Sequence, residues 1–303
     1  MLMHVIDTYL TIRRAAGFSY TGGEFLLRSF AGYAAARGET CVMASSAISW
    51  AAQAPSQTTR SQRLTTIRVF ARFARAEDPR HEIPPGGVFS AGQSRQIPYI
   101  FTEDEIELLV DQAARLGPPG SLRPHTYATL FGLLAVTGMR ISEALSLESA
   151  DFRVDHLVIR KTKFHKSRLV PLHPTTMAAL TGYVERRRRI AGDDPHIFVS
   201  LRRRGLQYGT VIEVFHLVCE AAGLPRQSGS WRLRMHDLRH TFAVRTLEGS
   251  PEGRDQIAQH TLALTTYMGH ARVASTYWYL QSTPTLMTDI AERCEALTHK
   301  EAP

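Results

Sequence analysis

Apolar residues recur at helical spacing through the first 76 positions of the chain. Gly, Thr and Ser residues interrupt this pattern, which therefore predicts four helices, over about residues 2–15, 21–37, 45–53 and 57–76. In the fourth segment Leu64, Ile67 and Phe70 mark an apolar face. Much of the remaining surface of that helix is basic, with Arg60, Arg63, Arg68, Arg72 and Arg75.

The helical pattern stops at residue 78. Residues 78–98 read DPRHEIPPGGVFSAGQSRQIP, and this density of Pro and Gly excludes a long helix or a central strand. The sequence therefore predicts a helical domain over residues 1–77, an interdomain linker over 78–98 and a second domain over 99–303.

The second domain begins with helix signals. Thr102 and Glu105 have the spacing of a capping box ahead of the apolar run IELLV. Another helix is predicted near residues 125–137, and it ends at Gly138, the residue type favoured for a left-handed cap. That cap turns the chain, so we expect Arg140 to leave the helix end rather than lie along its side.

Strand signals are few. Residues 156–160 and 168–172 predict a β-hairpin with a turn through 161–167, and residues 196–200, HIFVS, predict one more short strand. Helices are predicted again from Pro174 and from about His236. The expected fold is mainly α-helical with a small β-hairpin or sheet.

The composition indicates an ordinary folded protein. The chain has 303 residues, 44% of them apolar, enough for a core in each of two domains. It has no run of the roughly 18 apolar residues that a membrane span needs. The basic pair Arg13 and Arg14 follows the first apolar stretch, the reverse of a signal peptide. We therefore expect a cytoplasmic protein.

Three cysteines, Cys41, Cys219 and Cys294, lie far apart in apolar helical contexts. Their odd number and wide spacing favour buried, reduced thiols over a disulfide framework or a zinc cluster.

The charge fits a polyanionic partner. The formal net charge is +8, and residues 1–99 contain eleven basic and six acidic residues. Basic side chains that neutralise phosphates release counterions, which gives affinity for DNA of any sequence. The chain has only four lysines, and Lys161, Lys163 and Lys166 share one predicted turn. That clustering indicates a need for an ammonium group there, although a solvated turn would also explain it.

Candidate chemistry is concentrated in the second half of the chain. Arginine forks hold the nonbridging oxygens of a phosphodiester, Lys or His can give a proton to a leaving oxygen, and a Tyr hydroxyl can act as a covalent nucleophile. This set needs no metal ion and no cofactor. The candidate catalytic residues are Arg140, Lys163, His236, Arg239, His270 and Tyr279.

In this order, the residues resemble the active-site signature of the tyrosine recombinases, the family of phage integrases and Xer-type resolvases. The resemblance covers about residues 100–282. Its four motifs are T-G-x-R-x-x-E at Thr137, Gly138, Arg140 and Glu143; Lys163 before R-x-V-P-L at residues 168–172; H-x-L-R-H-T from His236 to Thr241; and Gly-His at 269–270, nine residues before Tyr279.

The resemblance implies a two-domain architecture and a mechanism. Tyr279 would attack the scissile phosphate and form a 3′-phosphotyrosyl link, without ATP. Arg140 and Arg239 would stabilise the charge on the phosphate oxygens, and Lys163 would protonate the departing 5′ oxygen. His236 would assist proton transfer at the nucleophile.

Further residues would support these. His270 would hydrogen-bond the phosphate. Glu143 would orient its neighbours, and His240 would support the site through hydrogen bonds without a chemical step of its own. Tyr277 is a second phenol near the nucleophile position, but the spacing from His270 favours Tyr279.

A metal site at His236 and His240 is the competing interpretation, because the two are spaced as in zincins. The zincin pattern requires Glu directly after the first His, and here Asp237 follows it. No metal is therefore expected.

The helical domain is similar to the DNA-contacting domain that these recombinases close over their substrate. The predicted DNA contacts are Arg60, Arg63, Arg68, Arg72, Lys161 and Lys166. A terminal amphipathic helix, with Leu286, Ile290, Cys294 and Leu297, would dock on a neighbouring protomer or on its own domain. The expected partners are duplex recombination sites, further copies of the chain in a tetrameric synapse, and accessory recombinases. Such a protein would associate with the nucleoid.

Three functions remain open on the sequence. The favoured one is a site-specific recombinase or integrase, of a mobile element. A type IB topoisomerase-like enzyme shares the residue types, but Gly-His before the tyrosine and the helical N-terminal domain speak against it. A catalytically idle DNA-binding regulator is the third, and the intact set of six residues argues against it.

Overall fold

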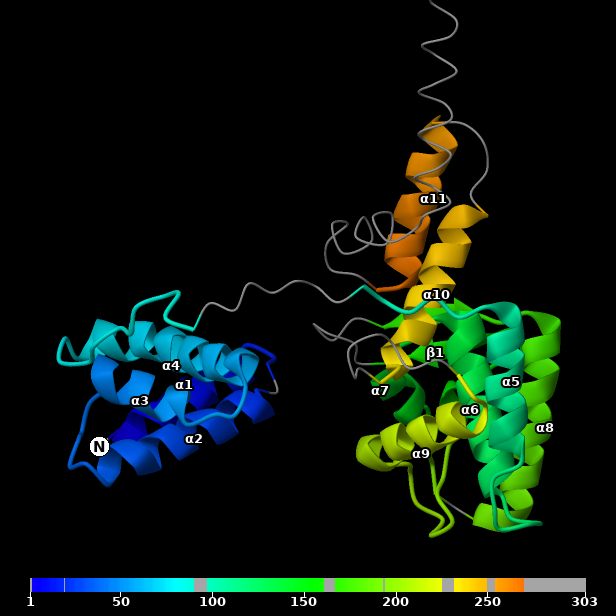
Figure 1. Ribbon diagram of the computed structural model, residues 1–303, viewed down its shortest axis with the longest axis horizontal. Helices are drawn as coiled ribbons and strands as arrows, with labels where there is room; N and C mark the ends of the chain where they lie inside the picture. Colours follow the sequence, from blue (N-terminus) through cyan, green and yellow to red (C-terminus); the bar gives the residue numbers. More distant parts are fainter. Residues whose placement is uncertain are drawn as a thin grey trace, which may run out of the picture. The chain divides into compact units, whose positions relative to one another are not determined.

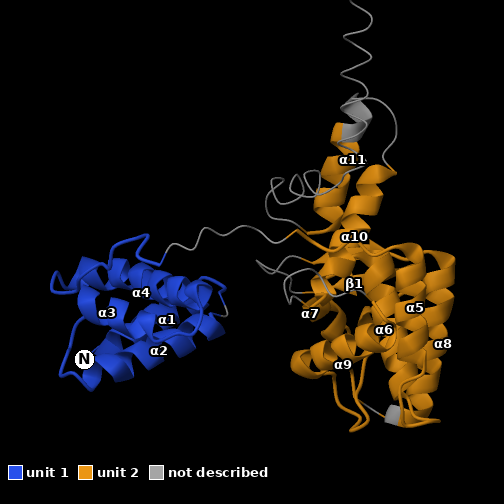
Figure 2. Ribbon diagram, viewed as in Figure 1, with its two compact units in different colours: residues 1–96 blue, residues 97–303 orange. Residues whose placement is uncertain are grey.

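The computed structural model describes residues 2–18, 20–89, 97–160, 167–192, 194–224, 232–249 and 254–269. The chain divides into two compact units, residues 1–96 and 97–303 (Figure 2). Among the described helices, none is both long enough and apolar enough to cross a membrane.

Unit 1 consists of α1 (Leu2–Ala15), α2 (Thr21–Ala35), α3 (Ala44–Ala52) and α4 (Gln57–Glu77). The four predicted helices are confirmed. Ser56 caps α4 by accepting a hydrogen bond from the Thr59 backbone N–H at 3.1 Å. The core is mostly aliphatic and contains two aromatic pairs: Tyr9 packs edge-on against Phe70, and Phe30 against Trp50.

Unit 2 is mostly helical (Figure 1). Its helices before the sheet are α5 (Glu103–Ala114), α6 (Arg123–Thr137), α7 (Ile141–Leu145) and the 3-10 helix η1 (Ser149–Asp151). The sheet is an antiparallel pair, β1 (His156–Ile159) and β2 (Arg168–Pro171), in which Ile159 lies opposite Arg168. The helices after it are α8 (Pro174–Ala191), α9 (Tyr208–Ala221), α10 (Met235–Glu248) and α11 (Arg254–Tyr267).

Helix α6 runs through the core of unit 2. Leu130 and Phe131 are fully buried, and Phe131 meets Phe215 of α9 edge to face. The buried Thr126 hydroxyl lies 3.1 Å from the Tyr183 hydroxyl of α8. Contacts with helices on both sides therefore fix the position of α6, whose C-terminal end leads into the candidate site.

The local signals in this unit are confirmed. Thr102 and Glu105 form both bonds of the capping box at the start of α5. Gly138 ends α6 with φ 56° and ψ 17°, the left-handed conformation that glycine adopts without strain. The hairpin strands are confirmed at residues 156–159 and 168–171.

The strand predicted at HIFVS is wrong. Residues 196–200 make only isolated bridges, His196 with Glu148 and Val199 with Gly205. The backbone N–H of Ile197 donates to Leu147, whereas the carbonyl of Phe198 accepts from Leu206. The segment therefore bonds to two different neighbours and no single partner strand. Its apolar run reflects burial alone.

The first residues of unit 2 are attached to α10. The Phe101 backbone N–H donates to the Thr241 hydroxyl at 3.0 Å, and Arg245 donates to the Phe101 carbonyl at 2.8 Å. The threonine of the H-x-L-R-H-T motif thus holds the start of this unit beside the helix that carries Arg239.

Cys41 and Cys219 are buried free thiols, as predicted. Burial raises the pKa of Cys219 to about 12. Cys294 lies outside the described residues.

Candidate active site

Arg140 stands at the N-terminus of α7, two residues beyond the left-handed turn at Gly138. Its backbone N–H donates to Glu143 Oε2 at 2.9 Å, and its Nη1 donates to Glu143 Oε1 at 2.8 Å. One carboxylate therefore caps the helix and orients the guanidinium at once. As predicted, the arginine leaves the end of α6 and does not lie along its side.

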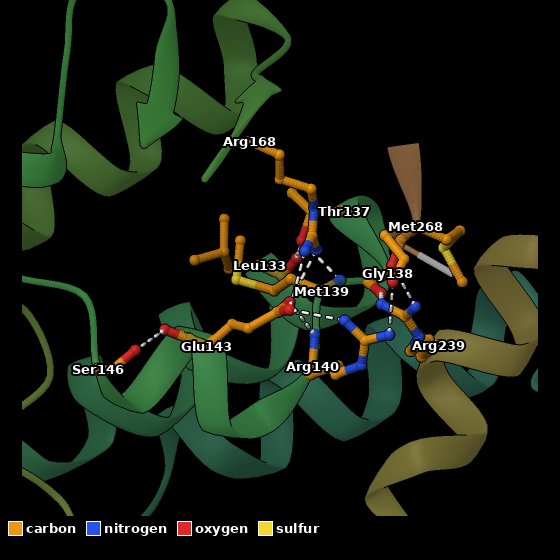
Figure 3. A network of polar contacts seen from close by, with 11 residues as sticks. Leu133, Thr137, Gly138, Met139, Arg140, Glu143, Ser146, Arg168, Arg239 and Met268 are labelled. Carbon is orange, nitrogen blue, oxygen red and sulfur yellow. Dashed lines mark hydrogen bonds and ion pairs between the residues drawn. The ribbon is translucent and has the colours of Figure 1, made fainter. Parts of the chain in front are cut away.

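Arg239 reaches the same place from α10. Its side chain is buried, and it donates from Nη1 to the Gly138 carbonyl and from Nη2 to the Met268 carbonyl, each at 2.6 Å. Arg140 donates from Nη2 to the neighbouring carbonyl, that of Gly269, at 3.0 Å. The two arginines thus converge on one short stretch of backbone (Figure 3). Two adjacent guanidinium groups are suited to a phosphodiester.

Close packing of α6 against α10 allows this convergence. A Cβ atom at Gly138 would lie 2.3 Å from Cδ1 of Phe242, on α10. Glycine is therefore required at this position for its left-handed conformation and also for the approach of the Phe242 ring. The same approach brings the Gly138 carbonyl within reach of Arg239.

Arg168 completes the network, a role that the sequence analysis did not assign to it. From β2 it donates Nη1 to Glu143 Oε1 and Nη2 to Glu143 Oε2, both at 2.8 Å. Burial alone would raise the pKa of Glu143, but the hydrogen bonds from Arg168 and Arg140 hold it at about 2. Glu143 thus stays ionised at neutral pH and binds two arginines. These contacts are consistent with an orienting role for Glu143, which stays a prediction.

Helix α10 begins in the same way as α7. The backbone N–H of Arg234 donates to Asp237 Oδ2 at 2.9 Å, and its Nη2 donates to Asp237 Oδ1 at 2.7 Å. Asp237 is fully buried. Its bonds fix the first turn of α10, the turn that presents His236.

His236 is solvent-exposed, although neighbouring protein atoms desolvate its ring. The surrounding protein, and then the charge of Arg239, lower the pKa of His236 to about 4. The imidazole is therefore neutral at neutral pH and can accept a proton. Its ring meets that of His240 edge to face, with centroids 4.6 Å apart. His240 is buried, which fits a supporting position.

Metal-ligand residue types come together elsewhere. Among the described residues, one group of three or more has its ligand atoms within 4.8 Å of one another, namely Cys41, Asp78 and His81 of unit 1. His236 and His240 do not belong to it. The Nδ1 of His81 already accepts the Val42 N–H at 3.0 Å, and Asp78 is paired with an arginine, so these side chains have structural partners.

Several predicted site residues lie outside the described residues. They are Lys161, Lys163, Lys166, His270 and Tyr279. The described backbone stops at residue 160 and resumes at 167, and it ends at Gly269, directly before His270.

The predicted DNA-contacting arginines of α4 fall into two kinds. Arg60 donates Nε to the Ala54 carbonyl at 2.7 Å, and the Arg63 guanidinium lies over the Trp50 ring at 5.0 Å from its centroid. Arg68 packs so close to Gly86 that a Cβ atom there would lie 2.4 Å from its Nη1. Arg72, by contrast, is exposed.

The model of the phage integrase family matches residues 100–285 of the chain, more than half of its length. The chain belongs to the phage integrase family. A Sinorhizobium fredii protein named as an integrase/recombinase, y4rB, is 37% identical over 301 residues, 96% of each chain. The tyrosine recombinase XerD of Brucella abortus is 29% identical over 241 residues, 76% of this chain and 73% of XerD.

An integrase of known structure shares the fold. The Tn1549 transposon integrase, solved in complex with transposon right end DNA, superposes with a TM-score of 0.63 at 18% identity, over 95% of this chain and 98% of the other. The predicted resemblance to tyrosine recombinases and the predicted two-domain architecture are confirmed.

Proposed function

We propose that this phage integrase family member is a site-specific DNA recombinase that cuts and rejoins duplex DNA through Tyr279. The observation that carries the proposal is the convergence of Arg140 and Arg239. The two come from different helices, yet their guanidinium groups donate to adjacent carbonyls, those of Gly269 and Met268. This arrangement places two permanent positive charges at the residue that precedes His270.

The reaction exchanges one phosphoester for another. The Tyr279 oxygen attacks the scissile phosphorus, the bond from phosphorus to the 5′ oxygen breaks, and a 3′-phosphotyrosyl link and a free 5′-hydroxyl result. A 5′-hydroxyl of another strand then attacks the link and releases the tyrosine. Bond energy is retained through both steps, so no ATP is needed.

The charges fit that chemistry. Arg140 and Arg239 would stabilise the charge that builds on the nonbridging oxygens, usually the largest electrostatic contribution in such reactions. His236 is neutral at neutral pH because its pKa is about 4, so it is ready to take a proton from the nucleophile. Lys163 would protonate the departing 5′ oxygen, and His270 would hydrogen-bond the phosphate.

Unit 1 would hold the DNA. Residues 1–77 form the proposed core-binding domain, with residues 78–98 as its linker to a catalytic domain over 99–303. Arg72 is the strongest candidate for a phosphate contact among the four arginines because it is exposed. Lys161 and Lys166 would supply further contacts beside Lys163.

The number of strands that recombination cuts determines how many protomers take part. Exchange between two duplexes cuts four strands, and each protomer carries one nucleophile, so four protomers would act in one synapse. The terminal helix with Leu286 and Ile290 would link neighbouring protomers, with accessory recombinases as further partners. We place the protein at the nucleoid, acting for a mobile element.

The proposal is tested by looking for a covalent adduct between the protein and DNA. The purified protein is incubated in EDTA with DNA from the ends of its native element, nicked near the cut site so that the released strand diffuses away. Denaturing gels then show the protein attached to DNA. We expect an adduct with the wild type and with Tyr277→Phe, and none with Tyr279→Phe.

Other outcomes would contradict the proposal. Specific binding without any adduct would make the protein an idle binder, and cleavage restored only by a divalent metal would overturn the mechanism. Relaxation of a supercoiled plasmid that lacks the native site would indicate a topoisomerase instead.

A further inference from the structure

We propose that Arg168 is a positioning residue, which sets the direction of the Arg140 guanidinium through the carboxylate that the two share. The inference rests on the proposed function, because it assigns a part in the same phosphate chemistry. None of the four recombinase motifs gives Arg168 a chemical task, and its contacts in the folded protein are what indicate one.

Glu143 is saturated by its two arginines. Oε1 accepts from Nη1 of Arg140 and from Nη1 of Arg168, and Oε2 accepts from the Arg140 backbone N–H and from Nη2 of Arg168, all between 2.8 and 2.9 Å. The bidentate bond to Arg168 fixes the plane of the carboxylate. Arg140 is left with a single side-chain bond to Glu143, from Nη1.

This division decides where Arg140 points. Without Arg168, the carboxylate could turn and accept both terminal nitrogens of Arg140, which is the preferred geometry of an isolated arginine–carboxylate pair. Arg140 would then be drawn back onto α7. With Arg168 in place, Nη2 of Arg140 is directed to the Gly269 carbonyl and the side chain keeps 32% of its surface exposed for a substrate.

Arg168 is itself held firmly. It is the first residue of β2, paired with Ile159 across the hairpin, and its side chain is only 13% exposed. Gly269, with φ 63°, lies against it, and a Cβ atom at that position would come within 2.9 Å of Arg168 Nη1 and 3.6 Å of Arg140 Nη1. The missing side chain at Gly269 therefore admits both guanidinium groups.

The hairpin offers a matched control. Arg160 follows β1 and pairs through Nε with the buried Asp151 at 2.5 Å. This is a second arginine–carboxylate pair on the same hairpin, and it does not involve Glu143. Arg160→Met therefore removes an ion pair to a buried carboxylate without touching Arg140.

The experiment is a double-mutant cycle. Single-turnover adduct formation at saturating protein is measured for the wild type, Arg168→Met, Arg140→Ala and the double variant. We expect Arg168→Met to lose roughly 100-fold, the scale of a misplaced catalytic group. The double variant should be no slower than Arg140→Ala, because Arg168 acts through Arg140.

A second substrate separates positioning from folding. A methylphosphonate at the cut site replaces one nonbridging oxygen with an uncharged methyl group, so cleavage depends less on a guanidinium. Arg168→Met should lose much less on this linkage than on the phosphodiester. Arg160→Met should change both rates by the same factor, since any loss would come from the folded fraction alone.

Two further variants separate a loss of stability from a loss of positioning. Arg168→Met leaves Glu143 buried without its bidentate partner, so Arg168→Met/Glu143→Gln removes both charges and should fold while staying slow on the phosphodiester. Arg168→Lys keeps the charge without the bidentate fork and should recover only part of the rate.

The outcomes are distinct. A wild type that forms no adduct overturns the proposed function. A wild type that forms one, with additive losses for Arg168→Met and Arg140→Ala, overturns the positioning role. Equal losses for Arg168→Met on the two linkages overturn it as well.

Discussion

The arginines of α4 and those of the candidate active site are held in different ways. On α4, Arg60 is bound to a carbonyl, Arg63 lies on a tryptophan ring, and Arg72 is exposed. In the active site, Arg140 and Arg168 share the buried Glu143.

The difference separates arginines that attract the DNA backbone from arginines that act on the reacting phosphate. A phosphate backbone presents many equivalent charges, so an arginine that only attracts it can keep a mobile tip. A reacting phosphate must be met within a fraction of an ångström, and a preorganised donor pays no reorganisation when charge develops. Buried carboxylates and backbone carbonyls supply that fixation at Arg140 and Arg239.

The largest effect on adduct formation should follow from replacement of the Arg239 guanidinium, which donates to two carbonyls. Arg239→Lys keeps the charge but cannot donate to the Gly138 and Met268 carbonyls together. We expect adduct formation to fall by roughly 100- to 1000-fold, the scale for removal of one oxyanion donor. Gel shifts on the same DNA should show nearly unchanged binding. A parallel loss of binding would place Arg239 with the attracting arginines.

The second-largest effect should follow from removal of the Glu143 charge, which Arg140 and Arg168 share. Glu143→Gln leaves Arg140 and Arg168 facing a neutral amide, and breaking one partner of a buried pair costs about 3–5 kcal/mol. Urea unfolding should show that loss. The protein that remains folded should cleave more slowly. Asp237→Asn, at the corresponding position of α10, should lose stability while the cleavage rate of the folded fraction changes less.

A titration should show the desolvation of His236 and the positive charge beside it. NMR titration of the free protein, with His236→Asn to assign the signal, should give a pKa near 4, well below the ordinary value of 6.5. Between pH 6.5 and 4 the unfolded chain binds a proton that the folded His236 refuses. Stability should therefore fall as the pH falls through this window. A value near 6.5 would contradict both the desolvation of His236 and the effect of Arg239 on it.

The smallest effect should appear on α4. Arg72→Ala should weaken binding to all DNA sequences alike and lower the slope of log K against log salt by about 1, as expected for one phosphate contact. Arg60→Ala should instead act mainly on stability, because Arg60 is bound to the Ala54 carbonyl. Equal salt slopes for Arg72→Ala and the wild type would remove Arg72 from the DNA interface.

The sequence predicted features that depend on neighbouring residues. The capping box at Thr102 and Glu105 and the left-handed cap at Gly138 follow from spacing within one turn, and both are present. The prediction of a strand at HIFVS was wrong because an apolar run indicates burial but does not identify a partner strand.

Contacts over long separations were not visible in the same way. Arg168 and Glu143 are 25 residues apart, on a strand and a helix, and nothing local joins them. Arg239 donates to the carbonyls of Gly138 and Met268. Every residue has a backbone carbonyl, so the sequence does not show which of them accept these bonds. Arginine at a helix N-terminus, as at Arg140, is also outside the usual capping residues.

The pair of Glu143 and Arg168 constrains how this protein can evolve. A lineage that replaced either residue first would pass through an ancestor that lacks a buried, bidentate ion pair. Such an ancestor would be selected against before the second replacement arose. We therefore expect the two positions to covary among descendants despite their distance along the gene.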